Sequence, residues 1–271
     1  MRRRLITGFL LIGFLSMPLI SDSKKDKMTI SAKEREDIIS DGAFVMPSAG
    51  ALANSLKIIF HNIDWNQFIK PNIKYIGKTN EEKVLNLGIK GADLFFLSIS
   101  QNVNNLTTVA KNTNLILNEI IINRKSINSV SRKKSLKNLQ KLIKKEKWGL
   151  VLKEITTLKE NINMDFEDMQ KHHLALLNDI GSWMEGYRLT VEALKLNYKK
   201  SETAILIQTP LINYLLKEIK NSKELEKFSK RDKIIDLLEN IDTILNQSKN
   251  YQLSKQDIDK LSNFFTNKDI L

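Results

Sequence analysis

The segment from Thr79 to about residue 102 constrains the fold most, because it is apolar on nearly every face of a helix. Thr79 and Glu82 have the spacing of a capping box, which predicts a helix start. Apolar side chains then fill two faces at helical spacing: Val84, Leu87, Leu94 and Phe95 on one, and Leu85, Ile89, Ala92, Phe96 and Ile99 on the other. A helix that is apolar all round lies inside a protein. We therefore expect a central helix with others packed around it.

The rest of the chain shows the same periodicity, and no alternating run predicts a strand. We predict an all-α protein, an irregular multi-helix bundle of about eight to nine helices with two glycine-bearing central helices. The second and third helices are expected to be continuous or kinked, and Pro210 is expected to kink or split a later one. The predicted helices span about 48–62, 80–102, 103–123, 133–146, 148–163, 165–198, 202–220, 223–247 and 255–267.

Four glycines lie in the middle of the two helices predicted to be central: Gly88, Gly91, Gly181 and Gly186. Glycine inside a helix costs about 1 kcal/mol relative to alanine, so each position needs a physical reason. One interpretation is that the two helices cross here with their backbones close together. The other is that the glycines line a cleft with room for a ligand. Under the first interpretation, leucine at Gly91 would overfill a tight contact.

Two carboxylates accompany these glycines. Asp93 falls in an apolar stretch, so it needs a partner or contact with water. Glu185 has Arg188 three residues on, within pairing distance on a helix. Structural pairing is the favoured account of both carboxylates. The alternative is a ligand pocket, serving a small-ligand sensor or an unrecognised hydrolase, lined by Asp93, Ser98, Gln101, Trp183, Glu185, Tyr187 and Arg188.

No recognisable motif for catalysis, a cofactor or a metal accompanies these residues. We predict no catalytic residue, no cofactor and no metal site, and an enzyme is the less favoured interpretation. The sequence has no Cys, which excludes disulfides and thiolate metal sites. Asp168 and His172 stand four residues apart on one predicted helix, but two ligands make a weak metal signal. We expect His172 and its neighbour His173 to be solvated.

A basic segment is the main predicted surface feature. From Arg124 to Lys147 there are ten basic residues and one acid, Glu146. Apolar residues supply the other side of this helix: Leu136, Leu139, Leu142 and Ile143. The plain interpretation is an amphipathic surface helix with its charges in water. The functional one is docking on anionic lipid headgroups or another acidic envelope surface, through a stripe at helical spacing formed by Lys134, Lys137, Lys141 and Lys144.

The N-terminus has the layout of a secretory signal peptide, with arginines at 2–4, an apolar run over 5–20 and small residues at 21 and 23. We predict an exported protein of the periplasm or cell envelope. Retention of the leader as a membrane anchor is the alternative, although the run is shorter than the roughly 20 residues of a spanning helix. The predicted division is a signal peptide over 1–23, a charged flexible lead-in over 24–43 and a helical domain over 44–271.

The formal net charge of +12 admits an anionic partner. Lysine greatly outnumbers arginine, whereas bidentate phosphate recognition favours arginine. We therefore expect no nucleic-acid partner. The predicted partner is an envelope protein of unknown identity or an anionic membrane surface, and the oligomeric state stays open.

Three segments together resemble a group of exported all-helical bacterial envelope proteins, many of them lipoproteins. These segments are 44–48 (Phe-Val-Met-Pro-Ser), 85–94 (Leu-Asn-Leu-Gly-Ile-Lys-Gly-Ala-Asp-Leu) and 181–186 (Gly-Ser-Trp-Met-Glu-Gly). The resemblance covers about residues 44–200 and brings no known activity. It implies that Asp93, Trp183 and Glu185 matter beyond packing. The chain departs from the pattern at Lys90, where the group has an aromatic residue, at Ser182, where it has glycine, and in lacking the lipid-bearing Cys.

Overall fold

The computed structural model describes residues 54, 56–60, 62–71, 77–120, 127–248 and 251–266. The predicted leader, the charged lead-in and the segment 44–48 lie outside these residues, as does much of the first predicted helix. Within them the protein is all-α, as predicted, and has no strand. The α-helices are α3 (Asn80–Ser100), α4 (Val103–Glu119), α5 (Ile127–Lys144), α6 (Trp148–Asp168), α7 (His172–Leu196), α8 (Thr209–Asn221), α9 (Arg231–Asn246) and α10 (Lys255–Thr266).

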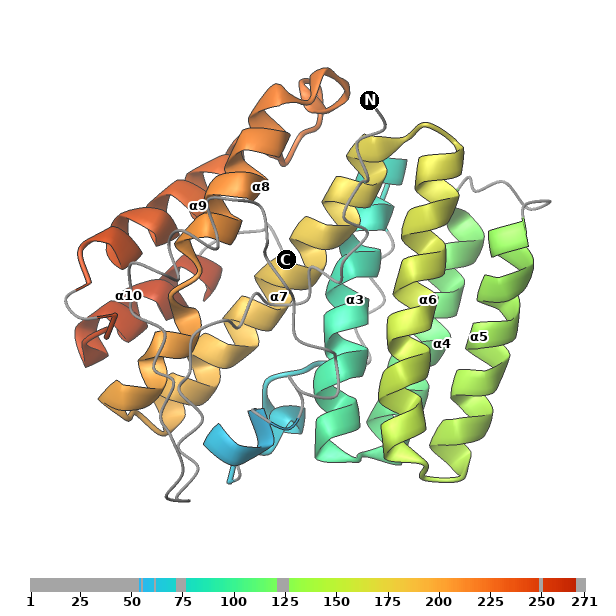
Figure 1. Cartoon of the computed structure of the whole chain (residues 1–271), viewed down its shortest axis with the longest axis horizontal. Coiled ribbons are helices and arrows are strands. Elements are labelled where there is room, and N and C mark those ends of the chain that lie inside the picture. The colour runs from blue at the N-terminus through green and yellow to red at the C-terminus, as the bar shows by residue number, and fades with distance from the viewer. Residues whose placement is uncertain are drawn as a thin grey trace, which may run out of the picture.

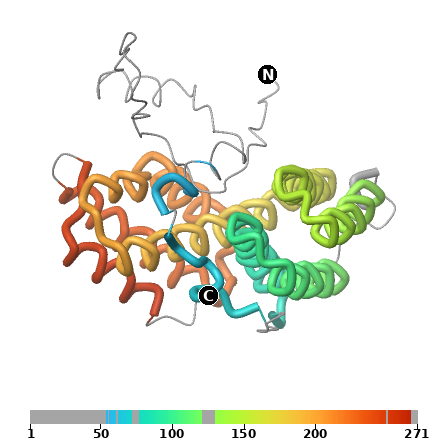
Figure 2. The backbone as a smooth tube through the Cα atoms, turned by 90° about the horizontal axis from the view of Figure 1, so that it is seen from below, coloured from blue at the N-terminus to red at the C-terminus, as the bar shows by residue number. Residues whose placement is uncertain are grey.

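Helix α7 runs through the middle of the molecule (Figure 1). It packs along α3, and this is the most extensive helix pair in the described structure. Helices α4, α5 and α6 lie on the α3 side, with α5 at the outer edge, whereas α8, α9 and α10 lie on the other side of α7 (Figures 1 and 2). The prediction of two central helices is therefore confirmed, and their contact joins two groups of outer helices.

The α3 helix begins where its capping residues predict. The Thr79 hydroxyl accepts a hydrogen bond from the Glu82 amide (3.2 Å), and the Glu82 carboxylate accepts one from the Lys78 amide (2.6 Å). The helix ends at Gln101, which takes a left-handed conformation with φ of 57°. Asn102 then caps α4 through the Asn105 amide (2.9 Å). The two helices are thus separate elements that pack on each other, not the continuous or kinked helix that we expected.

The boundary between α6 and α7 also differs from prediction. A single helix was expected from about residue 165 to 198, but α6 runs on to Asp168 and α7 begins at His172. Between them Gln170 adopts a φ of 57° and its amide donates to the Glu167 carbonyl (2.8 Å). Asp165, which we had placed in a first helical turn, lies in the last turn of α6. No glycine or proline marks this break in the sequence, so the pattern gave no sign of it.

The C-terminal helices are shorter than predicted. The 202–220 helix is split as expected: a 3-10 helix, η2 (Lys200–Leu206), precedes α8, which carries Pro210 in its first turn. Proline is tolerated there because the first amides of a helix lack helical partners. The helix expected from residue 223 begins at Arg231, after a short 3-10 helix, η3 (Lys223–Leu225).

Two of the four central glycines set the distance between α3 and α7. A Cβ added to Gly88 would lie 2.2 Å from the Asn178 carbonyl oxygen, and one added to Gly181 would lie 2.1 Å from that of Leu85. Both distances are far inside van der Waals contact, so only glycine allows this approach. At Gly91 the nearest atom to an added Cβ is the Ser182 hydroxyl at 3.8 Å. The predicted close crossing is therefore correct for Gly88 and Gly181 and wrong for Gly91.

Candidate functional site

The two central carboxylates face each other across the α3–α7 contact, and each has a cation beside it. Asp93 and Glu185 are 2 % and 3 % exposed. The Lys90 ammonium donates to Asp93 Oδ2 (2.7 Å), and Arg188 Nε donates to Glu185 Oε2 (2.8 Å). Each helix thus contributes one acid and one base three residues apart. We call these four residues, of which only Arg188 is partly exposed, the central charge cluster.

Charged groups within the central charge cluster shift the pKa values of their neighbours. Burial raises the pKa of Asp93 to about 7, helped by the charge of Glu185 and a hydrogen bond with it, and opposed by Lys90. For Arg188, burial opposes the charged form, but Glu185 and the fields of Asp93 and Glu192 outweigh it and raise its pKa. Near neutral pH the cluster therefore binds and releases a proton at Asp93, while Arg188 stays charged.

The central charge cluster also reaches a segment far away in the sequence. Arg188 donates a second hydrogen bond to the Phe68 carbonyl (3.1 Å). Phe68 follows the 3-10 helix η1 (Trp65–Gln67), whose buried Trp65 ring meets Phe96 of α3 edge-on at 4.6 Å between centroids. The guanidinium therefore joins α7 to the chain that precedes α3, through hydrogen bonds from its Nε and Nη2.

The structure does not gather the other members of the predicted ligand pocket around these carboxylates. Ser98 is buried and donates to the Phe95 carbonyl of its own helix (2.6 Å). Gln101 is exposed at the end of α3. Trp183 is fully buried, and its indole N–H donates to Gln208 Oε1 (2.8 Å). Of the seven residues predicted to line a pocket, the structure joins Asp93, Glu185 and Arg188 in the central charge cluster, and the polar groups of Ser98 and Trp183 bond elsewhere.

Tyr187, another predicted pocket residue, combines ring contacts with a buried hydroxyl. Its ring lies 5.0 Å from that of Trp183 and 6.2 Å from that of Phe265. Its hydroxyl is buried and has no hydrogen-bond partner among the described residues. Burial raises the pKa of this phenol. The group stays neutral, and the ring serves mainly as packing between α7 and α10.

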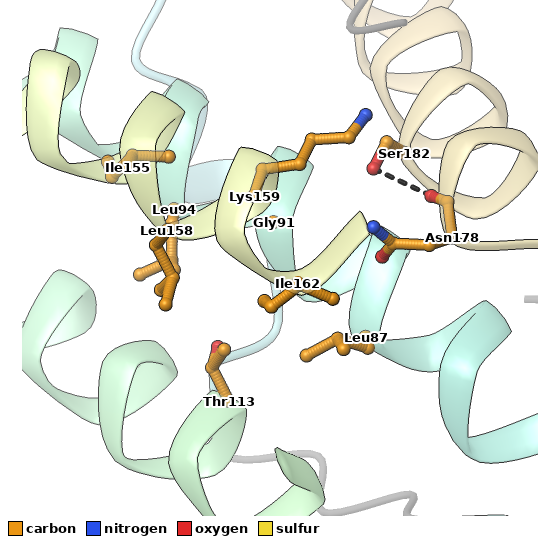
Figure 3. A pocket seen from close by; sticks show the side chains of 10 residues that line it. All are labelled: Leu87, Gly91, Leu94, Thr113, Ile155, Leu158, Lys159, Ile162, Asn178 and Ser182. Atoms are coloured by element: carbon orange, nitrogen blue, oxygen red, sulfur yellow. Dashed lines mark hydrogen bonds between the residues drawn. The ribbon is translucent and has the colours of Figure 1, made fainter. Parts of the chain in front are cut away.

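A small cavity lies beside the central contact, where α3, α4, α6 and α7 meet (Figure 3). Its volume is about 20 Å³, close to what one ordered water needs. Neither Asp93 nor Glu185 lines it. The lining residues are Leu87, Gly91, Leu94, Thr113, Ile155, Leu158, Lys159, Ile162, Asn178 and Ser182. The cavity explains the open space at Gly91, and it is too small for an organic ligand.

Polar residues beside the cavity form a second, partly buried network that spacing in the sequence did not predict. Lys159 Nζ lies 3.0 Å from Asp179 Oδ1, and the Asn163 amide donates to the same carboxylate (3.1 Å). Asn178 in turn donates to Asn163 (2.7 Å). These four residues join α6 to α7. A lysine within the otherwise apolar Ile155–Ile162 face was the available signal, but its partner on another helix could not be read from spacing.

The histidines do not form the metal pair that their spacing allowed. Asp168 ends α6 and His172 begins α7, so the two do not share one helix face. The exposed His172 ring instead pairs with Glu167. His173 is half-buried instead of solvated as expected, and burial lowers its pKa. No group of three or more metal-ligating side chains occurs within the residues that the structure describes.

The predicted lysine stripe lies on the outer face of α5. Lys134, Lys137, Lys141 and Lys144 are all exposed, whereas Leu136, Leu139 and Ile143 are buried in the hydrophobic core. Arg132 behaves differently from the lysines, because it is buried and pairs with Asp165 of α6. We define the α5 lysine face as the exposed lysines of this helix: Lys133, Lys134, Lys137, Lys141 and Lys144.

None of the helices in the described part of the chain is long and apolar enough to cross a membrane. No family model matches the chain, and no curated protein or solved structure is significantly similar to it. The site is therefore interpreted from its own geometry. That geometry offers the central charge cluster inside the protein and a basic helix face outside.

Proposed function

We propose that this chain is an exported cell-envelope protein with a non-enzymatic binding or scaffolding role. One observation carries the proposal: Asp93 and Glu185 are buried, and each is hydrogen-bonded to a cation of its own helix. Buried carboxylates that are already hydrogen-bonded to cations of the protein join parts of the fold and are not free to bind a substrate. The binding surface is then on the outside of the helices.

The export part of this proposal depends on the signal-peptide layout of residues 1–23 and on the resemblance to envelope proteins. A Cys-free chain is compatible with an oxidising compartment, because it has no thiol to mispair. Stability must then come from the core. The α3–α7 contact provides such a core with glycines at the closest approach.

A second candidate, a small-ligand sensor or hydrolase, is favoured by the titration of Asp93. A pKa of about 7 suits a general acid or base at neutral pH, and a second carboxyl lies beside it. Against this candidate, both side chains are almost fully buried and the nearby cavity does not reach them. A catalytic acid must contact its substrate, so this role needs an opening between α3 and α7.

Replacing the Glu185–Arg188 pair by two leucines separates the two candidates. Proteins often keep their fold when a buried ion pair is exchanged for apolar residues. The double variant is therefore expected to lose the carboxyl and guanidinium groups of this pair while it keeps the fold. Wild type and E185L/R188L would be expressed with a C-terminal tag, fractionated, and crosslinked in intact cells before affinity capture. Circular dichroism would verify that both proteins are folded.

The scaffold proposal predicts that both proteins appear in the envelope fraction without the leader and capture the same partner. Loss of the partner from the folded double variant would favour the sensor or hydrolase. Wild-type protein that remains in the cytoplasm with its leader intact would contradict the proposed location.

A further inference from the structure

The α5 lysine face carries charge that no described residue of the protein neutralises. Helix α5 contains no Asp or Glu, and none of its exposed lysines forms an ion pair with any described residue. The adjoining turn adds exposed Lys145 and Lys147 against one acid, Glu146. Some lysines elsewhere on the surface do pair with acids of the protein, such as Lys199 with Glu202 and Lys220 with Glu239. Positive charge is thus concentrated on one side of the molecule.

The charges on α5 are arranged in a line. Residues 134, 137, 141 and 144 alternate steps of three and four, so they lie above one another along the helix. At 1.5 Å per residue the line is about 15 Å long. Helix α5 lies at the outer edge of the bundle, away from α8, α9 and α10 (Figures 1 and 2). A flat surface can therefore meet α5 without meeting the other side of the protein.

Apolar side chains that are at least partly exposed occur before the first lysine of this line and shortly after the last one. Val130 is 66 % exposed and precedes Lys134 by four residues, so it lies on the same stripe. Beyond the other end, Trp148 is half-buried and Leu150 is 48 % exposed at the start of α6. Lysines bordered by tryptophan and aliphatic side chains are typical of helices that lie in a membrane interface.

We propose that the α5 lysine face docks on a membrane surface rich in anionic phospholipid, with Val130, Trp148 and Leu150 contacting the headgroup–acyl boundary. This inference rests on the proposed function, since it names the envelope component that the protein binds. The lysine ammonium is a point charge suited to a diffuse layer of headgroups, and arginine forks are not used. The other side of α7 then faces away from the bilayer.

The test is cosedimentation of the full-length chain with vesicles. One set of vesicles is equimolar phosphatidylglycerol and phosphatidylcholine, and the other is phosphatidylcholine alone. Binding to the second set measures any membrane binding by the apolar leader that does not need anionic lipid. The variant carries K134E, K137E, K141E and K144E. The matched control reverses four exposed lysines on the other side of the molecule, K217E, K223E, K227E and K233E, and so has the same net charge. Circular dichroism checks both folds.

We expect wild type and the matched control to bind the anionic vesicles and the α5 variant to bind at least about tenfold less. Binding should fall as salt is raised, because exposed charges are screened. If the α5 variant does not fold, a variant with glutamine at the same four positions replaces it. Its binding to the anionic vesicles should also be about tenfold weaker than that of wild type. W148A with L150A should lose less than the lysine variants.

Three outcomes would overturn the inference. One is equal binding by the α5 variant and wild type. Another is equal loss in the matched control, which would mean that only net charge matters. The third is saturable binding of soluble polyphosphate without binding to vesicles, which would identify an acidic polymer as the ligand. Each can occur while export and partner capture still succeed, so this inference can fail separately from the proposed function.

Discussion

The central charge cluster and the α5 lysine face differ in how the protein treats charge. Between α3 and α7, two acids and Lys90 are buried, Arg188 is half-buried, and each acid has a hydrogen-bonded cation beside it. On α5, five lysines are exposed, and none is paired within the described structure. Burying an unpaired charge is costly, so an interior site requires partners, whereas an exposed site does not. The difference separates charges that hold helices together from charges left for another molecule.

Composition alone does not explain the exposed lysines. Helix α9 is also an amphipathic surface helix, yet it has four acids and two bases, whereas α5 has six bases and no acid. A bias toward lysine codons would enrich both helices alike. The segregation of charge onto α5 is therefore a feature of the surface. The following predictions test whether the interior charges are structural and the exposed ones are not.

The largest effect is expected at the glycines of closest approach. In G88L the new side chain would begin 2.2 Å from the Asn178 carbonyl, so α3 and α7 must separate. We expect a loss of more than about 4 kcal/mol or no folded protein. Denaturant unfolding followed by circular dichroism measures it. A stability equal to that of wild type would mean that this contact does not fix the fold.

Breaking the central charge cluster should cost nearly as much. R188L leaves Glu185 buried without its cation and removes the bond to the Phe68 carbonyl. We expect a loss of about 3 kcal/mol, largely restored in E185L/R188L, because the double change leaves no unpaired charge at this pair. Unfolding free energies of wild type, both single variants and the double variant form the cycle. Additive losses would show that the pair is not coupled.

The central charge cluster should also make stability depend on pH. The folded state raises the pKa of Asp93 from 3.8 to about 7, so it holds a proton that the unfolded chain has released. Stability from this group is therefore present at low pH and falls as pH rises from about 4 to 7. D93N should flatten this part of the profile. Denaturant unfolding of both proteins at pH 5 and 8 measures it, and parallel profiles would contradict the role of Asp93.

A smaller effect is expected at Gly91, which borders the cavity. An added methyl group has 3.8 Å of clearance, so G91A should be tolerated. Alanine is the better helix former, and we expect a gain of up to about 1 kcal/mol. Thermal unfolding compared with G88A is the check. A large loss of stability in G91A would mean that α3 and α7 are in close contact at Gly91 after all.

The features that were predicted correctly from the sequence depend on interactions between residues close together in the chain. The capped start of α3, its burial, the division at Pro210 and the Glu185–Arg188 pair all depend on neighbours a few residues apart, and all are confirmed. The exposure of the α5 lysines is confirmed as well.

What was missed depends on contacts between distant segments. The Arg132–Asp165 and Lys159–Asp179 pairs join different helices, so spacing cannot reveal them. Which glycines touch depends on how α3 and α7 cross, and a helix pattern does not give that angle. The break at Gln170 uses a left-handed residue that is neither glycine nor asparagine. The same limit explains why spacing did not show that Ser98 and Trp183 bond to groups outside the central charge cluster.

The most direct test of the central claim measures stability and vesicle binding on one sample of the fourfold α5 variant, K134E/K137E/K141E/K144E. We predict that its unfolding free energy stays within about 0.5 kcal/mol of wild type, because these lysines lack internal partners, while binding to phosphatidylglycerol vesicles is lost. A destabilised variant would show that the lysines serve the fold. A stable variant that still binds the vesicles would show that α5 is not the contact surface.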